Sequence, residues 1–377
     1  MMKIALITPF PPYRGGISAH SKNLYDCLSV NNEIIVYNFS KQYPDFLFPG
    51  KTQYRDELIA DSSPNVVNIL NSINPLSWIK VAKNIIQGRF DKIIFRFWNP
   101  FFIPCYISII KVIKKFDSNV QIYSICDNIV AHENFFAQKS LVKFFLDQLD
   151  GIIIMSSGVE DELLELKRTY KYKKIFLPII NDLGELLDIS SSKKEIGLDP
   201  KDKVFMFFGL IREYKGLDIL LHAINKIDIN ILNNIKFLIV GENYEKIDKY
   251  KNILDDDKQS YVLWVTKYIS DSKLNLYFCS SDYVVLPYKR ASQSGIIPMA
   301  YYFNKPVIVS GVGSLKEMVV KGKTGFIFNN LDVEDLQNIL ETCIKDEIIT
   351  DLDEIKKIKN KLTTEHFVKD LIEFIDE

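Results

Sequence analysis

The feature that most constrains the fold is a regular alternation of short apolar runs with helical patterns along the first half of the chain. The apolar runs predict strands at residues 3–8, 33–38, 92–97, 121–125 and 151–155. Between several of them lie amphipathic patterns, such as Ile17–Leu28 and Gly158–Tyr170, that predict helices. Short buried strands alternating with helices indicate a parallel sheet that is covered on both faces.

The same alternation restarts in the second half of the 377-residue chain. The apolar pattern loosens around Leu177–Gly184, and Ser190–Lys194 is polar. Further strands are predicted at residues 204–208, 236–240, 261–265, 283–286 and 306–309, with helices that begin near Gly216, Ser270 and Gly295. We therefore predict an α/β protein with two Rossmann-like domains that face each other across a cleft. They span residues 1–184 and 185–355, and a helical segment at 356–377 is expected to pack back toward the N-terminal domain.

Composition excludes several classes of function. The chain has 47 basic and 48 acidic residues, so its charge gives no sign of nucleic-acid binding. Its five cysteines and four histidines are scattered without ligand-like spacing, which predicts reduced thiols in a cytoplasmic protein and no metal site. The most apolar window, Phe97–Ile110, is too short to cross a bilayer, and the N-terminus has no signal-peptide pattern.

Two loops in the second half combine cations, glycines and helix starts. The loop after strand 204–208 carries Arg212 and Lys215 between Gly209 and Gly216, and the loop after strand 283–286 ends in Gln293-Ser-Gly295. Cations beside a helix N-terminus attract an anion, because the free backbone N–H groups and the helix dipole already favour negative charge there. Two such loops in one half of the chain predict a single diphosphate held between them.

A third glycine-rich loop follows the first strand. Gly15 and Gly16 precede the predicted helix, where backbone without a Cβ can approach a phosphate or a sugar hydroxyl. A plain turn explains the same glycines equally well. The loop lacks the G-x-G-x-x-G spacing of dinucleotide sites, which argues against NAD.

Taken together, these motifs resemble the retaining glycosyltransferases of family 4, also called group 1, which have the GT-B fold. The resemblance spans almost the whole chain and is strongest in the second half. It is carried by Gly15-Gly16, Gly209–Gly216, Ser281–Pro287, Lys305–Glu317 and Gly322–Gly325.

The resemblance implies an enzyme that moves a hexose-like sugar from a nucleotide diphosphate-sugar to a hydroxyl of a glycan or lipid-linked glycan, with retained configuration. Such enzymes assemble surface polysaccharides or oligosaccharides, and they need neither a cofactor nor a bound metal. Arg212 and Lys215 would neutralise the departing diphosphate as its charge grows in the transition state. The donor-binding set implied by the resemblance is Gly15, Gly16, Gly209, Gln293, Ser294, Gly295 and Glu317.

The chain also departs from the family pattern. Two glutamates that many members carry fall on Ala291 and Met299, and the usual arginine after the glycine is Leu210. Relatives carry a histidine near the donor sugar where this chain has Asp127, which we expect to act in catalysis. His132 and Glu133 match a second pair of the family and are candidates on the acceptor side, although a structural role for His132 fits equally well.

Two stretches of the first half allow two interpretations each. Arg96–Phe102 either packs the edge of the sheet, which is the more common role for such residues, or forms an aromatic wall for an acceptor. The basic run Lys167–Lys174 is either a solvated charged face or a surface that attracts anionic lipids on the inner face of a membrane.

Other functions remain open at this stage. A nucleotide-sugar epimerase shares the fold, and so does a phosphorylase, which would need a pyridoxal-binding lysine and a longer chain. A non-catalytic partner that binds glycans or sugar nucleotides could have lost the two glutamates. A glycan-binding module, however, has no use for the diphosphate cations Arg212 and Lys215.

Overall fold

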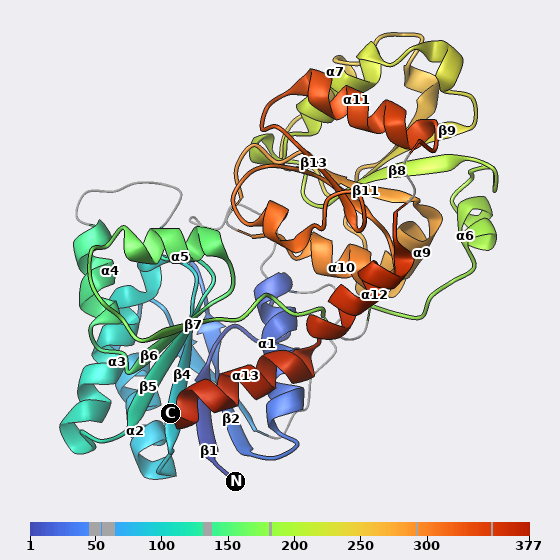
Figure 1. Ribbon diagram of the computed structural model, residues 1–377. Coiled ribbons are helices and arrows are strands. Elements are labelled where there is room, and N and C mark those ends of the chain that lie inside the picture. Colours follow the sequence, from blue (N-terminus) through green and yellow to red (C-terminus); the bar gives the residue numbers. More distant parts are fainter. Residues whose placement is uncertain (45–53, 55–64, 131–137, 181–182, 292, 348–349) are drawn as a thin grey trace. The chain divides into compact units, whose positions relative to one another are not determined.

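The computed structural model describes residues 1–44, 54, 65–130, 138–180, 183–291, 293–347 and 350–377. The chain forms two compact units (Figure 1). The first contains Met1–Pro178 together with Thr364–Glu377, and the second contains Ile179–Thr363.

The described part of the first unit contains a seven-stranded parallel sheet with the order β3-β2-β1-β4-β5-β6-β7. Its strands are β1 (Lys3–Ile7), β2 (Glu33–Lys41), β3 (Val66–Asn71), β4 (Lys92–Phe97), β5 (Gln121–Cys126), β6 (Gly151–Ile154) and β7 (Tyr172–Lys174). The chain runs outward from β1 to one edge and then returns to start again at β4. This reversal is the Rossmann topology, and it brings the loops after β1 and β4 together at the carboxyl edge of the sheet.

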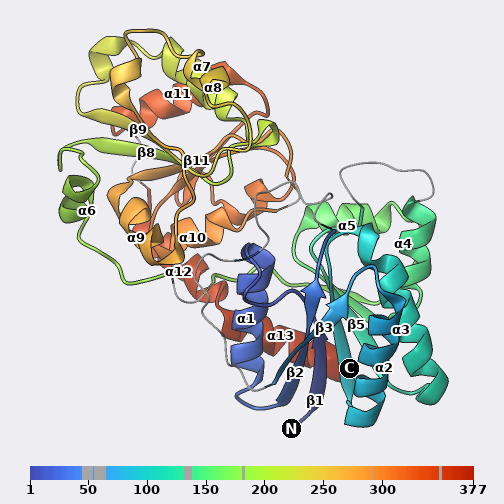
Figure 2. The same cartoon turned by 180° about the vertical axis from the view of Figure 1, so that it is seen from behind.

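Alternate residues of these strands feed two separate cores. Ala5, Ile7 and Phe95 face one side, together with apolar residues of α2 (Pro75–Gly88), α3 (Ile103–Phe116), α4 (Gln138–Leu146) and α5 (Ser157–Leu164). Ile4, Leu6 and Ile94 face the other side, which α1 (Gly16–Leu28) and α13 (Thr364–Asp376) cover (Figure 2). Strands buried on both faces explain why the sequence shows continuous apolar runs rather than alternation.

The second unit repeats the topology with six parallel strands among its described residues, in the order β10-β9-β8-β11-β12-β13. They are β8 (Lys203–Phe208), β9 (Ile235–Val240), β10 (Val262–Val265), β11 (Tyr283–Leu286), β12 (Val307–Ser310) and β13 (Gly325–Phe328). Here the order reverses between β8 and β11, so this sheet has its own switch point.

Helices cover both faces of the second sheet. One core joins the sheet to α7 (Leu217–Lys226), α8 (Asp248–Lys251) and α11 (Val333–Ile344). The other joins it to α9 (Asp271–Ser280), α10 (Ile296–Tyr302) and α12 (Leu352–Lys361), while α6 (Ile189–Glu195) packs beside α9. Short 3₁₀ helices are η2 (Pro100–Phe102), η3 (Glu213–Lys215), η4 (Ile229–Ile231), η5 (Gln259–Tyr261) and η6 (Leu315–Met318).

The units divide after Pro178, whereas the sequence placed the division at residue 184. The backbone N–H of Ile179 donates to the carbonyl of Leu362 at 2.7 Å, and Ile179 and Leu183 pack into the second core, which ties them to that unit. The predicted segment 356–377 is shared, because α12 stays with the second unit and only α13 packs on the first. The helix predicted for Gly158–Tyr170 ends at Leu164, before a left-handed turn at Lys167 (φ 53°).

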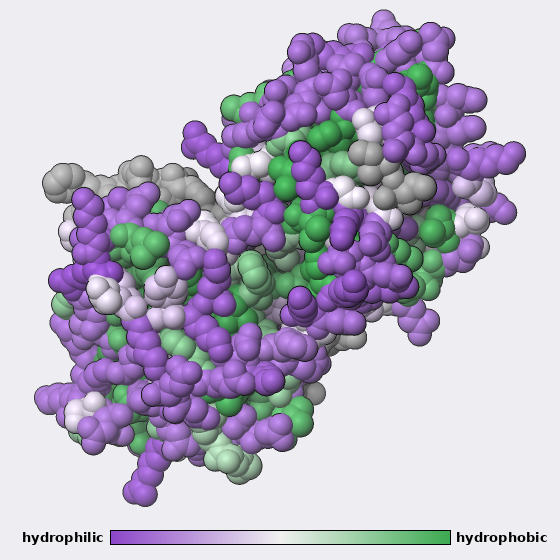
Figure 3. Space-filling view, in the orientation of Figure 1, coloured by the Kyte–Doolittle hydropathy of each residue, from purple (hydrophilic) through white to green (hydrophobic). Residues whose placement is uncertain are grey.

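Hydrophilic side chains dominate the surface in Figure 3, and apolar ones form scattered patches. Among the described residues, we find no helix with the length and hydropathy that a membrane span requires.

Candidate functional site

The loops that the sequence singled out in the second unit lie at its switch point. They follow β8, β11 and β12, which are neighbours in the sheet, so their three loops start side by side at its carboxyl edge. Ligands of doubly wound sheets bind at this position, in the crevice where the strand order reverses. The topology thus brings residues 209–216, 287–291, 293–295 and 311–318 to one place.

Arg212 and Lys215 carry the positive charge of this site. The Arg212 guanidinium carbon lies 4.5 Å from the centre of the Tyr244 ring, and the Lys215 ammonium lies 3.8 Å from that of Tyr288. Within the described part of the chain, neither side chain pairs with a carboxylate. Two cations held on aromatic faces keep their charge available to an incoming anion.

Lys215 is half-buried, and the loss of hydration makes it an unusual lysine. The pKa of its ammonium is lowered to about 8, mainly by the loss of hydration; Tyr214 opposes this shift and the nearby Arg212 charge adds to it. A buried ammonium without a counter-ion is costly, because desolvation disfavours the charged form. A bound diphosphate would remove that cost.

Two glycines shape the loop that carries these cations. Gly209 has a φ of 126° and Gly216 a φ of 68°, values that L-residues rarely adopt. A Cβ on Gly216 would lie 1.8 Å from the carbonyl oxygen of Pro287, whereas one on Gly209 would meet open space. Gly216 therefore allows the loops after β8 and β11 to touch, and the open space beside Gly209 suits its predicted place in the donor site.

The loop after β11 is tied to the first loop by Lys289. Its backbone N–H donates to the Tyr214 carbonyl at 2.8 Å, and its ammonium pairs with Asp218 at 2.7 Å. Farther along, the buried Ser294 accepts a hydrogen bond from the N–H of Ile296 at 3.2 Å. Gln293 and Gly295 flank it at the start of α10, as the sequence predicted, but no contact tests their roles with a ligand.

The loop after β12 places Glu317 in η6, at the same edge of the sheet. Its role toward a donor stays a prediction. The two positions where relatives carry glutamates have apolar surroundings here. Met299 is buried in the core, and Ala291 packs against it. A carboxylate at position 299 would place a charge in the core.

In the first unit, Gly15 and Gly16 form the exposed start of α1. Gly15 has a φ of 105° and precedes the helix, and no side chain caps the free N–H groups of its first turn. A Cβ on either glycine would meet nothing within 4 Å. The space and the free amides agree both with a ligand-facing loop and with a plain turn.

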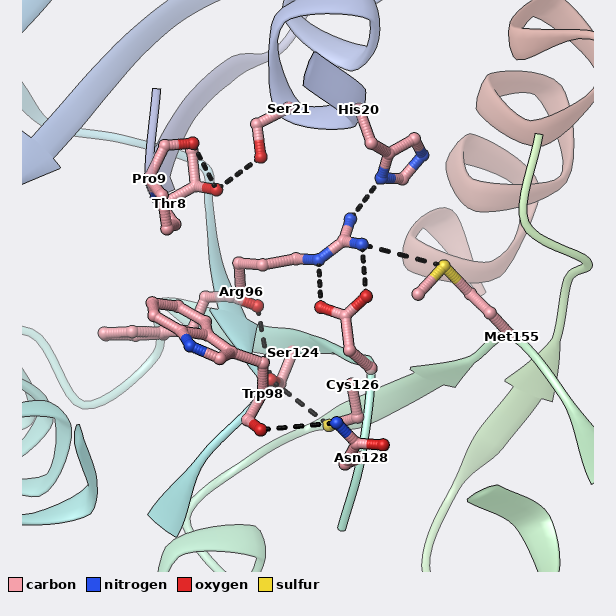
Figure 4. Close-up of polar contacts among 12 residues, drawn as sticks. Thr8, Pro9, His20, Ser21, Arg96, Trp98, Ser124, Cys126, Asn128 and Met155 are labelled. Carbon is pink, nitrogen blue, oxygen red and sulfur yellow. Dashed lines mark hydrogen bonds and ion pairs between the residues drawn. The ribbon is translucent and has the colours of Figure 1, made fainter. Parts of the chain in front are cut away.

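The structure places Asp127 in a buried ion pair with Arg96 (Figure 4). The guanidinium donates from Nε to Oδ2 at 2.5 Å and from Nη2 to Oδ1 at 2.6 Å. Both residues lie at the carboxyl edge of the sheet, at the end of β4 and just after β5. Asp127 is thus held rigidly where a ligand would bind, but the carboxylate is already engaged, and its catalytic role stays a prediction.

Arg96 also joins this pair to α1. Its Nη1 donates to Nδ1 of His20, and Nη2 lies 3.9 Å from the sulfur of Met155. Since an arginine can only donate, His20 must accept at Nδ1 and carry its proton on Nε2. Nε2 is buried, and among the described residues it has no hydrogen-bond partner. Burial, reinforced by the Arg96 charge, lowers the pKa of His20 well below its ordinary value, so the ring is neutral at physiological pH.

Two further predicted stretches of the first unit have different outcomes. His132 and Glu133 lie outside the described residues. In the stretch Arg96–Phe102, Phe97 and Phe102 are fully buried, while Trp98 is half-buried and donates to the Tyr43 hydroxyl at 2.9 Å. Packing therefore accounts for most of that stretch.

The basic run Lys167–Lys174 is largely neutralised by neighbours. Arg168 pairs with Asp147, Lys173 with Asp370 and Glu373, and Lys174 with Glu160. This run is a solvated, internally paired face, so it offers little free charge to an anionic lipid.

Sequence reasoning missed three residues of these sites: His20, Arg96 as an ionic partner, and Tyr288. Arg96 and His20 are 76 positions apart, and only the sheet order brings them together. One signal was present for Arg96, because a charged residue inside the apolar run Lys92–Phe97 must find a buried partner.

Comparison with known proteins adds independent information. Residues 188–361 match the family described as glycosyl transferases group 1. An uncharacterized glycosyltransferase of Methanocaldococcus jannaschii is 22% identical over 92% of this chain and 90% of its own length. An uncharacterized 41.2 kDa protein in the cps region of Klebsiella pneumoniae is 29% identical over 38% of this chain, and the chain spans only 37% of that relative.

The solved structure of Anabaena HepE in complex with UDP superposes with a TM-score of 0.76. It covers 100% of both chains at 17% sequence identity. At that identity the likeness establishes the fold, in which both units have the same architecture as those of HepE.

Proposed function

On the premise that the chain carries a glycosyl transferase group 1 domain at residues 188–361, we propose that the protein transfers a sugar from a nucleotide diphosphate-sugar to a hydroxyl group. The acceptor is a glycan or a lipid-linked glycan, and the reaction belongs to the assembly of polysaccharides or oligosaccharides. The observation that carries the proposal is the pair of Arg212 and Lys215 at the switch point, close together and without carboxylate partners among the described residues.

The chemistry follows from where charge develops. The bond between the anomeric carbon and the diphosphate oxygen breaks, and the acceptor oxygen bonds to that carbon. The acceptor proton passes to the departing diphosphate, so no separate general base is required. We propose that this occurs with retention of configuration, as the resemblance implies. Arg212 and Lys215 stabilise the leaving diphosphate, whose negative charge grows in the transition state.

Metal independence is part of the proposal. Two cationic side chains can supply the charge that a divalent ion supplies elsewhere, and both are half-buried, where their field is less screened than on the open surface. We expect turnover in excess EDTA to match turnover without it. Strong inhibition that Mg²⁺ or Mn²⁺ reverses would overturn this part of the mechanism.

We further propose that the protein acts in the cytoplasm, at the inner face of a membrane. Its five cysteines are all free thiols, as in a reducing compartment. We place the membrane contact on α2, where the exposed apolar side chains of Leu76 (75%) and Ile79 (42%) share one stripe with the exposed Lys80 and Lys83. An apolar stripe with flanking lysines fits an anionic lipid surface.

Vesicle sedimentation tests this contact. The protein should sediment with phosphatidylglycerol-containing vesicles and not with neutral ones, and Leu76→Glu with Ile79→Glu should abolish binding. Substituting Lys173 and Lys174, which are already paired, should leave binding unchanged. Equal sedimentation of the α2 variant would place the contact elsewhere, and no sedimentation at all would remove the membrane from the account.

Turnover separates the enzyme from its alternatives. A glycan-binding partner should ignore nucleotides, and an epimerase should consume a nucleotide-sugar without releasing the nucleoside diphosphate. We expect release of nucleoside diphosphate that depends on an acceptor and falls at least ~100-fold in Arg212→Ala or Lys215→Ala. Lys201→Ala, at an exposed lysine of the same unit, is the matched control. Near-normal turnover in either clamp variant would refute the proposed site.

A further inference from the structure

The Lys215 ammonium lies near two aromatic rings. Its Nζ lies 3.8 Å from the centre of the Tyr288 ring and 5.3 Å from that of Tyr214. In the described residues it has no ion pair or hydrogen bond. Tyr288 belongs to the loop after β11 and is fully buried. One loop thus supplies the cation, and the other supplies the surface on which it rests.

The backbone at Tyr288 is held in place by neighbouring segments. Ser310, at the end of β12, donates to the Tyr288 carbonyl at 2.6 Å, and the Tyr288 hydroxyl lies 3.4 Å from that of Ser294. The following residue, Lys289, bonds to the Tyr214 carbonyl at 2.8 Å. The backbone that carries the ring therefore cannot move relative to the loop that carries Lys215 without breaking these contacts.

We propose that Tyr288 is a positioning residue for the diphosphate clamp, whose ring face holds the Lys215 ammonium in a seat that does not neutralise it. This inference rests on the proposed function, because it concerns the same anion site. A carboxylate at this position would fix the lysine equally well but would cancel its charge. A ring face attracts the cation through its quadrupole, most strongly when both are desolvated, and leaves the full charge for the ligand.

The Tyr288 hydroxyl has a separate place in this arrangement. It reaches toward Ser294, beside the predicted donor residues Gln293 and Gly295, whereas the ring face serves Lys215. Removing the hydroxyl should therefore leave the clamp intact, while removing the ring should not. This difference makes Tyr288→Phe the matched control for Tyr288→Leu.

A double-mutant cycle tests the inference. Binding of UDP, GDP and dTDP is measured by calorimetry for the wild type, and the tightest ligand is carried forward. We expect Tyr288→Leu to weaken its binding roughly tenfold, and Tyr288→Phe to stay within about twofold. In a Lys215→Met background, Tyr288→Leu should have almost no further effect, because the cation is gone. Melting curves report whether each variant is folded.

The outcomes distinguish a failure of the Tyr288 inference from a failure of the proposed function. A Tyr288→Leu loss of equal size with and without Lys215 would show a merely structural role and overturn the inference, while the proposed function would stand. Wild-type protein that binds none of the nucleotides would overturn both. Should Tyr288→Leu fail to fold, phenylalanines with increasing fluorination at position 288 keep the shape and weaken the ring face. Binding that does not weaken stepwise with fluorination would also overturn the inference.

Discussion

Arg96 and Asp127 form a buried, bidentate ion pair at the carboxyl edge of the first sheet, with nitrogen–oxygen distances of 2.5 and 2.6 Å. Through Nη1, the same guanidinium contacts His20 on α1, the helix that begins at the Gly15-Gly16 loop. One buried arginine therefore links the loops that follow β1 and β5, across β4. These are the loops to which the sequence assigned ligand contacts.

Breaking this pair should destabilise the first unit strongly. Arg96→Met leaves the buried Asp127 carboxylate without its partner, and we expect a loss of about 3 kcal/mol or more in the free energy of unfolding. Denaturant titration followed by circular dichroism measures it. The exposed pair of Lys22 and Asp26 is the control, because Lys22→Met should cost less than ~1 kcal/mol. Equal, small losses for both variants would mean that the Arg96 pair is not buried as described.

The neutral His20 makes stability sensitive to acid. Because folding lowers the pKa of this ring below its unfolded value, the stabilisation is complete above about pH 6.5 and is lost as the pH falls below it. His20→Gln keeps an acceptor for Arg96 but cannot take up a proton. We expect the stability of the wild type to fall more steeply between pH 7 and 5 than that of the variant. Parallel curves would contradict a neutral, buried His20.

Ligand affinity should fall at alkaline pH, because Lys215 loses its charge there. Its pKa of about 8 in the free protein means that raising the pH through 8 removes the charge that attracts the diphosphate. Affinity should therefore decline above pH 8, with uptake of a proton on binding. Lys215→Arg stays charged and should show a flat profile. A wild-type affinity that is constant from pH 7 to 9.5 would show that the ammonium is not part of the site.

The same pKa predicts an effect on stability of opposite sign. Between pH 8 and about 10.4 the unfolded chain keeps the Lys215 proton that the folded chain has lost, so the contribution of this residue to stability rises with pH. Lys215→Met removes the cost of burying the charge. We expect the variant to unfold at a higher temperature than the wild type at pH 7, and a lower temperature would count against a desolvated ammonium.

Substitutions in the Gly15-Gly16 loop distinguish a loop that contacts a ligand from a plain turn. At Gly16 a side chain meets open space and the φ is ordinary, so Gly16→Val should fold normally and lose turnover. At Gly15 the φ of 105° penalises any side chain, so Gly15→Ala should lower the melting temperature. A Gly16→Val variant that unfolds, or one with full turnover, would favour the simple turn.

Much of the fold could be predicted from local pattern. Buried parallel strands such as Lys92–Phe97 and Tyr283–Leu286 are continuous apolar runs, and their predicted bounds match the structure. Strands β3 and β7 were missed, because the edge strand Val66–Asn71 is only partly buried and contains asparagines, and Tyr172–Lys174 is short and basic. An edge strand pairs with only one neighbour and is partly exposed to solvent, so its sequence lacks the continuous apolar run of a buried strand.

The site was predictable where one loop carries its residues and was not where the fold assembles them. Arg212 and Lys215 stand three positions apart, so their proximity is local. The contact of the Lys215 ammonium with Tyr288 and the contact of Arg96 with His20 depend on strand order, which a single sequence does not display. The basic run Lys167–Lys174 shows the converse: its charge is visible in the sequence, but its neutralisation by Asp147, Glu160 and α13 is not.

The central claim is that Arg212 and Lys215 form a diphosphate site. It is tested most directly by thermal stabilisation with UDP, GDP, dTDP and CMP, comparing the wild type with the Arg212→Ala, Lys215→Ala double variant. A ligand at 100 times its dissociation constant adds about 2.7 kcal/mol of stability. We predict that one nucleoside diphosphate stabilises the wild type clearly, that CMP does so less, and that the double variant does not respond. No response of the wild type, or an equal response of the double variant, would contradict the account.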